Sequence, residues 1–229
     1  MNDIVQHPNL TRRSLLSGVA LGGAVTLASG ALSRVAVAQG TTTTPAATPP
    51  ADAPAEAMAA PMPKPVSESD LEILNFALGL ERLEAAFYAQ IQGAQQERAF
   101  LNERMLGAAR EIGANEIAHL QALETAIIDG GGTPAVAASY RFPSNVFISP
   151  VAFTWFAHTL EEIGIGAYLG AVGQIESGAL RRAAASIYGS ETRHAALLRS
   201  LGGFIIAPRY FESPLSVEQV QGLIAPSVA

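Results

Sequence analysis

The sequence contains no cysteine among its 229 residues. This absence excludes disulfides, thiolate catalysis, iron–sulfur clusters and zinc sites built from cysteine. Any metal ion that the chain binds must therefore be held by Glu, Asp or His, which favours harder ions such as iron, manganese or zinc.

Charged residues are also scarce, at 15% of the chain, whereas hydrophobic residues make up 49%. This composition is apolar enough for a substantial core, and the length allows one domain with an appendage. The first 38 residues hold three arginines and one aspartate, so the remainder has 11 basic and 19 acidic residues and a net charge of −8. An acidic chain lacks the basic surface of nucleic-acid-binding proteins, so no nucleic-acid partner is expected.

The only long apolar run covers residues 15–32, directly after Arg12 and Arg13. A basic start, an apolar middle and the ending Ala36-Val37-Ala38 predict a signal peptide over residues 1–38. The paired arginines resemble the twin-arginine class, which predicts a periplasmic or secreted protein. The alternative is a retained transmembrane anchor, but the run is short and interrupted by four glycines. No transmembrane segment is expected in the mature protein.

Residues 39–66 consist mostly of Thr, Ala and Pro and predict a stiff, disordered linker. Helical signals follow: Ser69-Asp70-Leu71-Glu72 is a capping-box pattern, and apolar residues recur at helical spacing behind it. The predicted helices cover residues 69–92, 97–128, 150–176 and 179–201. A bundle over residues 67–203 and a C-terminal tail, residues 204–229, that packs on it are expected.

Residues 133–148 lack helical periodicity and contain Pro134 and Pro143, so they predict a long connection. A simple up-and-down bundle needs no such loop. One long crossover between the second and third helices predicts an all-α, ferritin-like four-helix bundle. No segment shows the alternation typical of strands.

Two Glu-x-x-His motifs stand on predicted helices, at Glu116–His119 and Glu191–His194. Three residues are close to one helical turn, so each Glu and His share a face and can bind one metal ion together. Each of the other two helices has a Glu followed seven residues later by a Tyr, which makes the chain a weak internal duplication. These two pairs are Glu81 with Tyr88 and Glu161 with Tyr168.

This arrangement matches the general ligand pattern of di-iron carboxylate bundles. Four carboxylates in an apolar core would repel one another, and two divalent ions remove that conflict. We therefore expect two divalent metal ions, iron or manganese. The predicted ligands are Glu81, Glu116, His119, Glu161, Glu191 and His194.

Several neighbouring residues are weaker candidates for metal ligands. Glu84, one turn after Glu81, could replace it as a ligand, but only Glu81 has the seven-residue relation to a tyrosine. His158, one turn before Glu161, is expected to support the ligands or lie at the surface and not to bind metal. Tyr88 and Tyr168 are either hydrogen-bond partners of the ligands or simple core residues.

At these positions the sequence resembles the ferritin-like domain family, in the branch of exported bacterial proteins that includes desiccation-related proteins. The resemblance spans about residues 70–200. The matching stretches are Leu74-Asn75-Phe76-Ala77-Leu78 with Glu81, Phe87 and Tyr88, then Glu116-x-x-His119, Leu160-Glu161 with Ala167-Tyr168, and Glu191-x-x-His194. The resemblance implies the fold and a metal site and leaves the reaction open, because this fold hosts oxidases, peroxidases, catalases, oxygenases and iron stores.

The leading hypothesis is an exported metal-binding protein with redox capacity toward oxygen or peroxide and a protective role under oxidative or drying stress. A manganese-catalase-like enzyme is one alternative, in which glutamates shuttle protons. A metal-free helical structural or stress module is another. The oligomeric state is left open, although a proline-rich linker argues against a closed cage.

Overall fold

The computed structural model describes residues 66–228, and its regular structure is helical. The predicted signal peptide and nearly all of the predicted linker lie outside these residues. Within them, the only β-type pairing is an isolated bridge between Tyr140 and Val228, so the prediction of an all-α fold is confirmed. The helices are α3 (Glu68–Glu97), α4 (Glu103–Asp129), α5 (Pro150–Val172), α6 (Gly178–Gly202) and α7 (Val217–Ile224), with short 3-10 turns η1 (Ser144–Phe147) and η2 (Ala225–Ser227).

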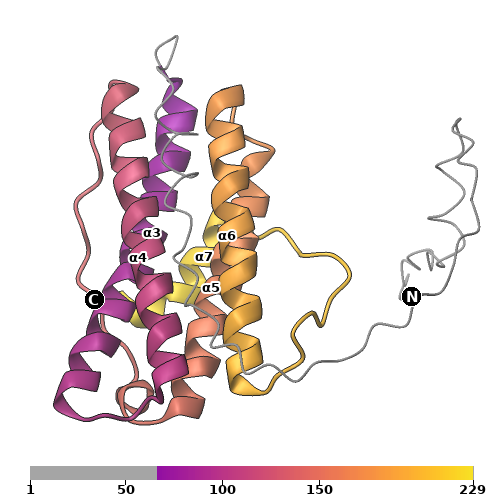
Figure 1. The fold of residues 1–229 in the computed structure, drawn as a ribbon. Helices are drawn as coiled ribbons and strands as arrows, with labels where there is room; N and C mark the ends of the chain where they lie inside the picture. Colours follow the sequence, from indigo (N-terminus) through magenta and orange to yellow (C-terminus); the bar gives the residue numbers. More distant parts are fainter. Residues whose placement is uncertain (1–65, 229) are drawn as a thin grey trace, which may run out of the picture. The chain divides into compact units, whose positions relative to one another are not determined.

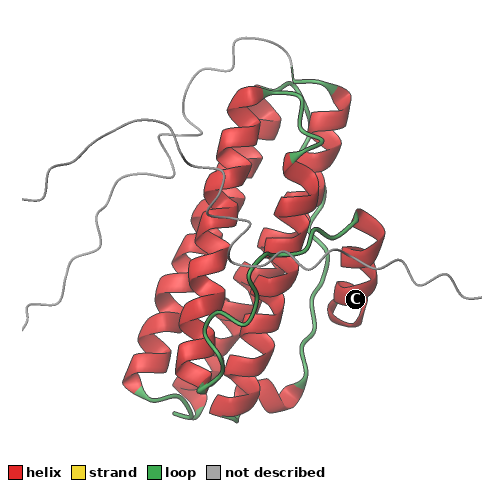
Figure 2. Ribbon diagram, turned by 90° about the vertical axis from the view of Figure 1, so that its right-hand side faces the viewer, coloured by secondary structure: helices red, strands yellow, loops and turns green. Residues whose placement is uncertain are grey.

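Four long helices form the bundle as two antiparallel pairs, α3 with α4 and α5 with α6 (Figure 1). Residues 130–149 connect the pairs and run along the outside of the bundle, from the end of α4 back to the start of α5 (Figures 1 and 2). A helix of 27 residues such as α4 is about 40 Å long, so only a long segment can make this return. The predicted crossover between the second and third bundle helices is thus present.

The helix ends differ in detail from those that the sequence predicts. Ser67, not Ser69, caps α3: its hydroxyl accepts the backbone N–H of Asp70 at 3.2 Å. The carboxylate of Asp70, buried to 1% exposure, instead accepts the backbone N–H groups of Glu176 and Ser177 at 2.7 and 2.9 Å. The capping-box interpretation was wrong because this side chain is used over a long range, to hold the α5–α6 turn against α3.

Glycine also fails to end the first helix where we expected. α3 continues past Gly93 to Glu97, and α4 begins only at Glu103. A single glycine weakens a helix by about 1 kcal/mol but does not stop it, and packing of the surrounding turns outweighs that amount. α5 ends at Val172, four residues before the predicted end.

The tail after α6 lies against α5. Leu215 donates its backbone N–H to the carbonyl of Gly166 at 2.9 Å. A Cβ on Gly166 would lie 2.6 Å from the Leu215 side chain, and one on Gly170 would lie 2.1 Å from its carbonyl oxygen. The absence of side chains at these two positions of α5 therefore permits this close approach. Farther along, Val220 of α7 joins a small apolar cluster with Leu80.

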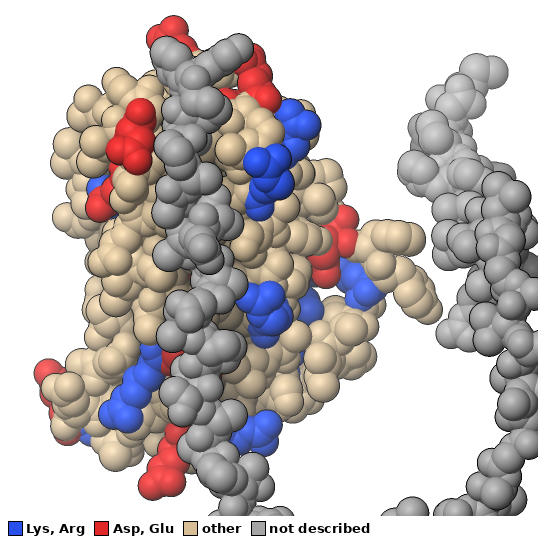
Figure 3. Space-filling model, turned by 45° about the horizontal axis from the view of Figure 1, so that its top comes forward, with Lys and Arg blue, Asp and Glu red and all other residues tan. Residues whose placement is uncertain are grey.

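The surface carries both signs of charge. On the face in Figure 3, acidic and basic side chains lie in small mixed groups, with uncharged areas between the groups. Across residues 66–228, no helix is long and apolar enough to cross a membrane.

Candidate metal centre

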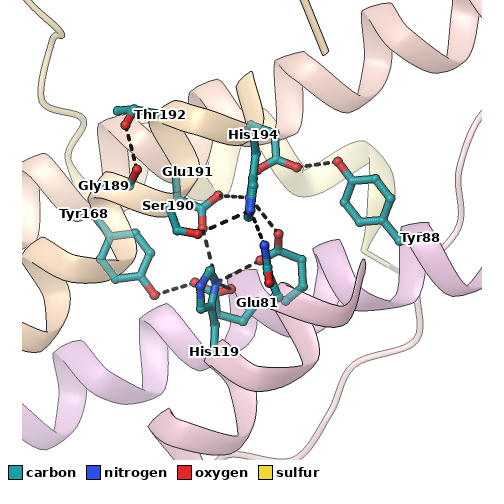
Figure 4. A network of polar contacts seen from close by, with 12 residues as sticks. Glu81, Tyr88, His119, Tyr168, Gly189, Ser190, Glu191, Thr192 and His194 are labelled. Atoms are coloured by element: carbon teal, nitrogen blue, oxygen red, sulfur yellow. Dashed lines mark hydrogen bonds and ion pairs between the residues drawn. The ribbon is translucent and has the colours of Figure 1, made fainter. Parts of the chain in front are cut away.

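Each bundle helix places one of the four predicted glutamate ligands in the middle of the bundle, and all four are fully buried. His119 and His194 follow one turn after two of them and are 4% and 5% exposed. In Figure 4 the two imidazoles face the same cluster, with Tyr88 and Tyr168 approaching from opposite sides. The structure thus brings together the six residues that the sequence proposes as ligands: Glu81, Glu116, His119, Glu161, Glu191 and His194.

The first group of potential ligands surrounds His119. Its Nδ1 atom lies 3.0 Å from Glu116 Oε2, 3.2 Å from Glu81 Oε2 and 3.3 Å from Glu191 Oε1. Helices α3, α4 and α6 therefore each contribute a carboxylate here. One ligand atom from each of these four residues lies within 4.8 Å of all the others, close enough to hold one ion.

The second group surrounds His194 in the same way. Its Nδ1 atom lies 3.0 Å from Glu116 Oε1, 3.2 Å from Glu161 Oε2 and 3.8 Å from Glu191 Oε2. Glu116 and Glu191 belong to both groups, and each turns one oxygen toward each histidine. Carboxylates shared in this manner can bridge two ions.

Three oxygens of the shared carboxylates are buried and approach a histidine nitrogen without forming a well-aligned hydrogen bond: Glu116 Oε1 and both Oε atoms of Glu191. Buried polar atoms are normally paired, because an unpaired one loses its hydration without compensation. Oxygen and imidazole donors suit iron or manganese. The donor set and these unpaired oxygens therefore fit a pair of divalent ions.

The two tyrosines bind glutamates across the bundle. Tyr88 of α3 donates its hydroxyl proton to Glu161 of α5, and Tyr168 of α5 donates to Glu81 of α3. Seven residues correspond to about 10 Å along a helix, too far for a tyrosine to reach the glutamate of its own helix. The antiparallel neighbour brings the other glutamate within reach.

Burial and charge determine how the metal-free cluster holds protons. Burial raises the pKa of Glu81 to about 8. Burial also raises the pKa of Glu161 well above its usual range, and the nearby charges of Glu191 and Glu116 add to this effect. Burial opposes the charged form of His119, but the carboxylates around it outweigh that effect and raise its pKa to about 12. Metal ions would displace these protons.

Sequence reasoning missed two residues behind His194. The Nε2 atom of His194 lies 3.0 Å from Asn115 Nδ2 and 3.3 Å from Ser190 Oγ. Groups that bind the outer nitrogen of a ligating histidine orient its ring and select its tautomer. Each of the two residues directly precedes a motif glutamate, and the i, i+4 spacing of Ser190 and His194 was a usable signal.

His158 and Glu84 have different places. His158 is outside both ligand groups and packs beside the rings of Trp155 and Phe204, at centroid distances of 6.0 and 5.2 Å. Glu84 is 3% exposed and lies in the core together with Glu81, not in its place.

Comparison with known proteins agrees with this geometry. A family model described as "Ferritin-like domain" matches residues 69–203, a segment that contains both ligand groups. A search among curated proteins finds no match.

Proposed function

The chain belongs to the ferritin-like domain family, and from this premise we propose that it is an exported protein that binds two divalent ions, iron or manganese, and uses them in redox chemistry with oxygen or peroxide. One observation carries the proposal. Two buried groups, each of three carboxylates and one histidine, share Glu116 and Glu191. Two ions held by shared carboxylates are placed to act on one small substrate together.

When bound, such ions would supply the electrons that oxygen or peroxide requires. The chain's own residues would set the conditions for that chemistry. Glu116 and Glu191 hold the two positions together, and Asn115 and Ser190 orient His194. Burial of the cluster keeps bulk water away. Tyr168 donates a hydrogen bond to Glu81 and would keep its carboxylate in place when metal binding releases the proton of Glu81.

Metal content is the first test. Protein purified from its native host is expected to carry about two ions of iron or manganese per chain. Protein that carries none, and whose melting temperature is unchanged by a chelator, would instead support the metal-free structural module.

Peroxide distinguishes the redox hypotheses. Rapid oxygen release when peroxide is added to the manganese form would support the manganese-catalase-like alternative. Oxidation of bound iron by oxygen or peroxide, without oxygen release, would support an oxidase or storage role. The matched control is a variant with both His119 and His194 replaced by Ala, which should be inactive in either assay.

The export and stress-protection parts of the proposal rest on the sequence. Arg12 and Arg13 before an apolar run support twin-arginine export, with cleavage after Ala38. The protective role under oxidative or drying stress rests on the resemblance to exported ferritin-like proteins that include desiccation-related proteins. Replacing both arginines by Lys should abolish translocation. Unchanged export of that variant would contradict the twin-arginine assignment.

A further inference from the structure

The internal duplication is broken at one buried position. Glu81 and Glu161 occupy corresponding places in the two halves of the bundle, and three residues later stand Glu84 and Gly164. One half thus has a fifth carboxylate directed into the core, and the other half has no side chain at all. The difference is local, because the glutamates, histidines and tyrosines of the duplication occur in both halves.

Gly164 leaves the space into which Glu84 extends. A Cβ on Gly164 would lie 3.3 Å from Glu84 Oε1 and 3.5 Å from Glu191 Oε2. These two oxygens therefore flank the same opening in the side of α5. The backbone does not require glycine there, because the position is inside a helix and has no positive φ. A glycine inside a helix lowers stability by about 1 kcal/mol relative to alanine. Its advantage at position 164 is therefore the space that the missing side chain leaves for Glu84.

The surroundings of Glu84 differ from those of the other carboxylates. Glu81 and Glu161 each receive a tyrosine hydroxyl and lie beside a histidine nitrogen. Glu84 stands on α3, but its Oε1 atom lies with Glu191 Oε2 at the opening beside Gly164, one turn after Glu161. Glu84 is therefore directed toward α5 and α6, the helices that carry Glu161, Glu191 and His194.

We propose that Glu84 is a seventh protein ligand of the metal centre, bound to the ion held by the group around His194, and that it makes the two metal positions unequal. This inference rests on the proposed metal function. The Glu84 carboxylate is 3% exposed and has no tyrosine or histidine partner, so its negative charge is neither hydrated nor paired. A bound cation would supply the stabilising charge that its surroundings lack. The second position then has one more oxygen ligand than the first and binds hard ions more tightly.

Two substitutions test the proposal by metal binding alone. Metal-free full-length protein is titrated with Mn²⁺ by calorimetry, and with Co²⁺ by visible absorption, which reports coordination number. Glu84→Gln should weaken one of the two sites by at least about tenfold, since even outer partners of ligands cost 10–100-fold. Gly164→Ala should weaken the same site, because its methyl group would displace the Glu84 carboxylate.

Gly79→Ala is the matched control for the glycine substitution. Gly79 is also a helical glycine, on α3, but a Cβ there would meet no atom within 4 Å, so both affinities should remain unchanged. The position is assigned with single-site backgrounds. Glu84→Gln should reduce the remaining affinity of His119→Ala protein, which retains the second position, and should not reduce that of His194→Ala protein.

The outcomes separate this proposal from the metal function itself. Wild-type protein that binds no metal would refute the proposed function. Wild-type protein that binds two ions, with unchanged or increased affinities and an unchanged Co²⁺ spectrum in Glu84→Gln, would refute only the role of Glu84. If Glu84→Gln does not fold, Gly164→Ala decides, with Gly79→Ala as its control. Weakening of the second position alone would support the role of Glu84, whereas equal weakening of both positions would refute it and point to displacement of Glu191, which serves both groups.

Discussion

Each histidine of the cluster is expected to control one metal ion. His119 and His194 each supply the only nitrogen of their ligand group, whereas the carboxylates of Glu116 and Glu191 serve both groups. Replacement of either histidine by Ala should therefore reduce the stoichiometry from about two ions per chain to about one. The double variant should lose both ions, because no nitrogen donor remains in either group.

The expected magnitude follows from the contacts. A lost direct ligand should cost at least the 10–100-fold in affinity that loss of an outer partner costs. At a free metal concentration of 100 times the dissociation constant, one bound ion stabilises the fold by about 2.7 kcal/mol, and a tenfold weaker site would reduce this to about 1.4 kcal/mol. For a domain of this size the difference lowers the melting temperature by about 3–5 °C.

The decisive assay is metal stoichiometry, measured after equilibrium dialysis at a free Mn²⁺ concentration of about ten times the wild-type dissociation constant, where an intact site is nearly full and a site weakened by about a hundredfold or more is nearly empty. Melting temperature alone is ambiguous, because removal of one partner of a buried ion pair costs about 3–5 kcal/mol even without metal. The control is His158→Ala, which removes a histidine that packs against Trp155 and Phe204 outside the cluster. If His158→Ala empties the site while His119→Ala and His194→Ala still bind two ions, the ligand assignment is wrong.

Three further predictions concern stability. Burial raises the pKa of Glu81 from 4.5 to about 8, so between these pH values the metal-free fold keeps a proton that the unfolded chain has released. The free energy of unfolding of the metal-free protein should therefore fall as pH rises from 5 to 8, and denaturant titrations at the two pH values check this. The affinity for Mn²⁺ should increase over the same range, because metal binding displaces that proton, and calorimetry at pH 5 and 8 checks this. Tyr168→Phe removes the hydroxyl that binds Glu81 and should lower the free energy of unfolding by about 1.5–3 kcal/mol. Gly113→Ala would place a Cβ 2.8 Å from the Cβ of Tyr88 and should lower the free energy of unfolding by about 1–3 kcal/mol. Gly79→Ala adds a Cβ where no atom lies within 4 Å, so in the same unfolding experiment it should leave the free energy of unfolding unchanged or raise it.

Local patterns in the sequence predicted the fold class and the composition of the cluster. The Glu-x-x-His spacing places two donors on one helical face whatever surrounds the helix, because the helical period alone determines it. Pro134, Pro143 and the glycines after α4 exclude a continuous helix there, which indicated the crossover. These features depend only on backbone geometry within one segment, so they can be read without a three-dimensional structure.

Long-range contacts could not be read in this way. Asp70 fits a capping pattern in the sequence, but its carboxylate binds backbone N–H groups more than 100 residues away. Tyr88 and Tyr168 share a face with the glutamates of their own helices, yet each binds the glutamate of the opposite helix. The hydrogen-bond partner of each of these side chains depends on which helices pack beside each other in the folded protein.

By itself, the sequence determined which side chains are available and which helical face each one occupies. Tertiary structure decided which oxygens meet, because only helix packing brings Glu116 and Glu191 between the two histidines. It also decided that Glu84 joins the core beside Glu81, through space left by a glycine on another helix. The physical reason is that helical periodicity is a property of a few consecutive residues, whereas burial and contact between carboxylates are properties of the packed bundle.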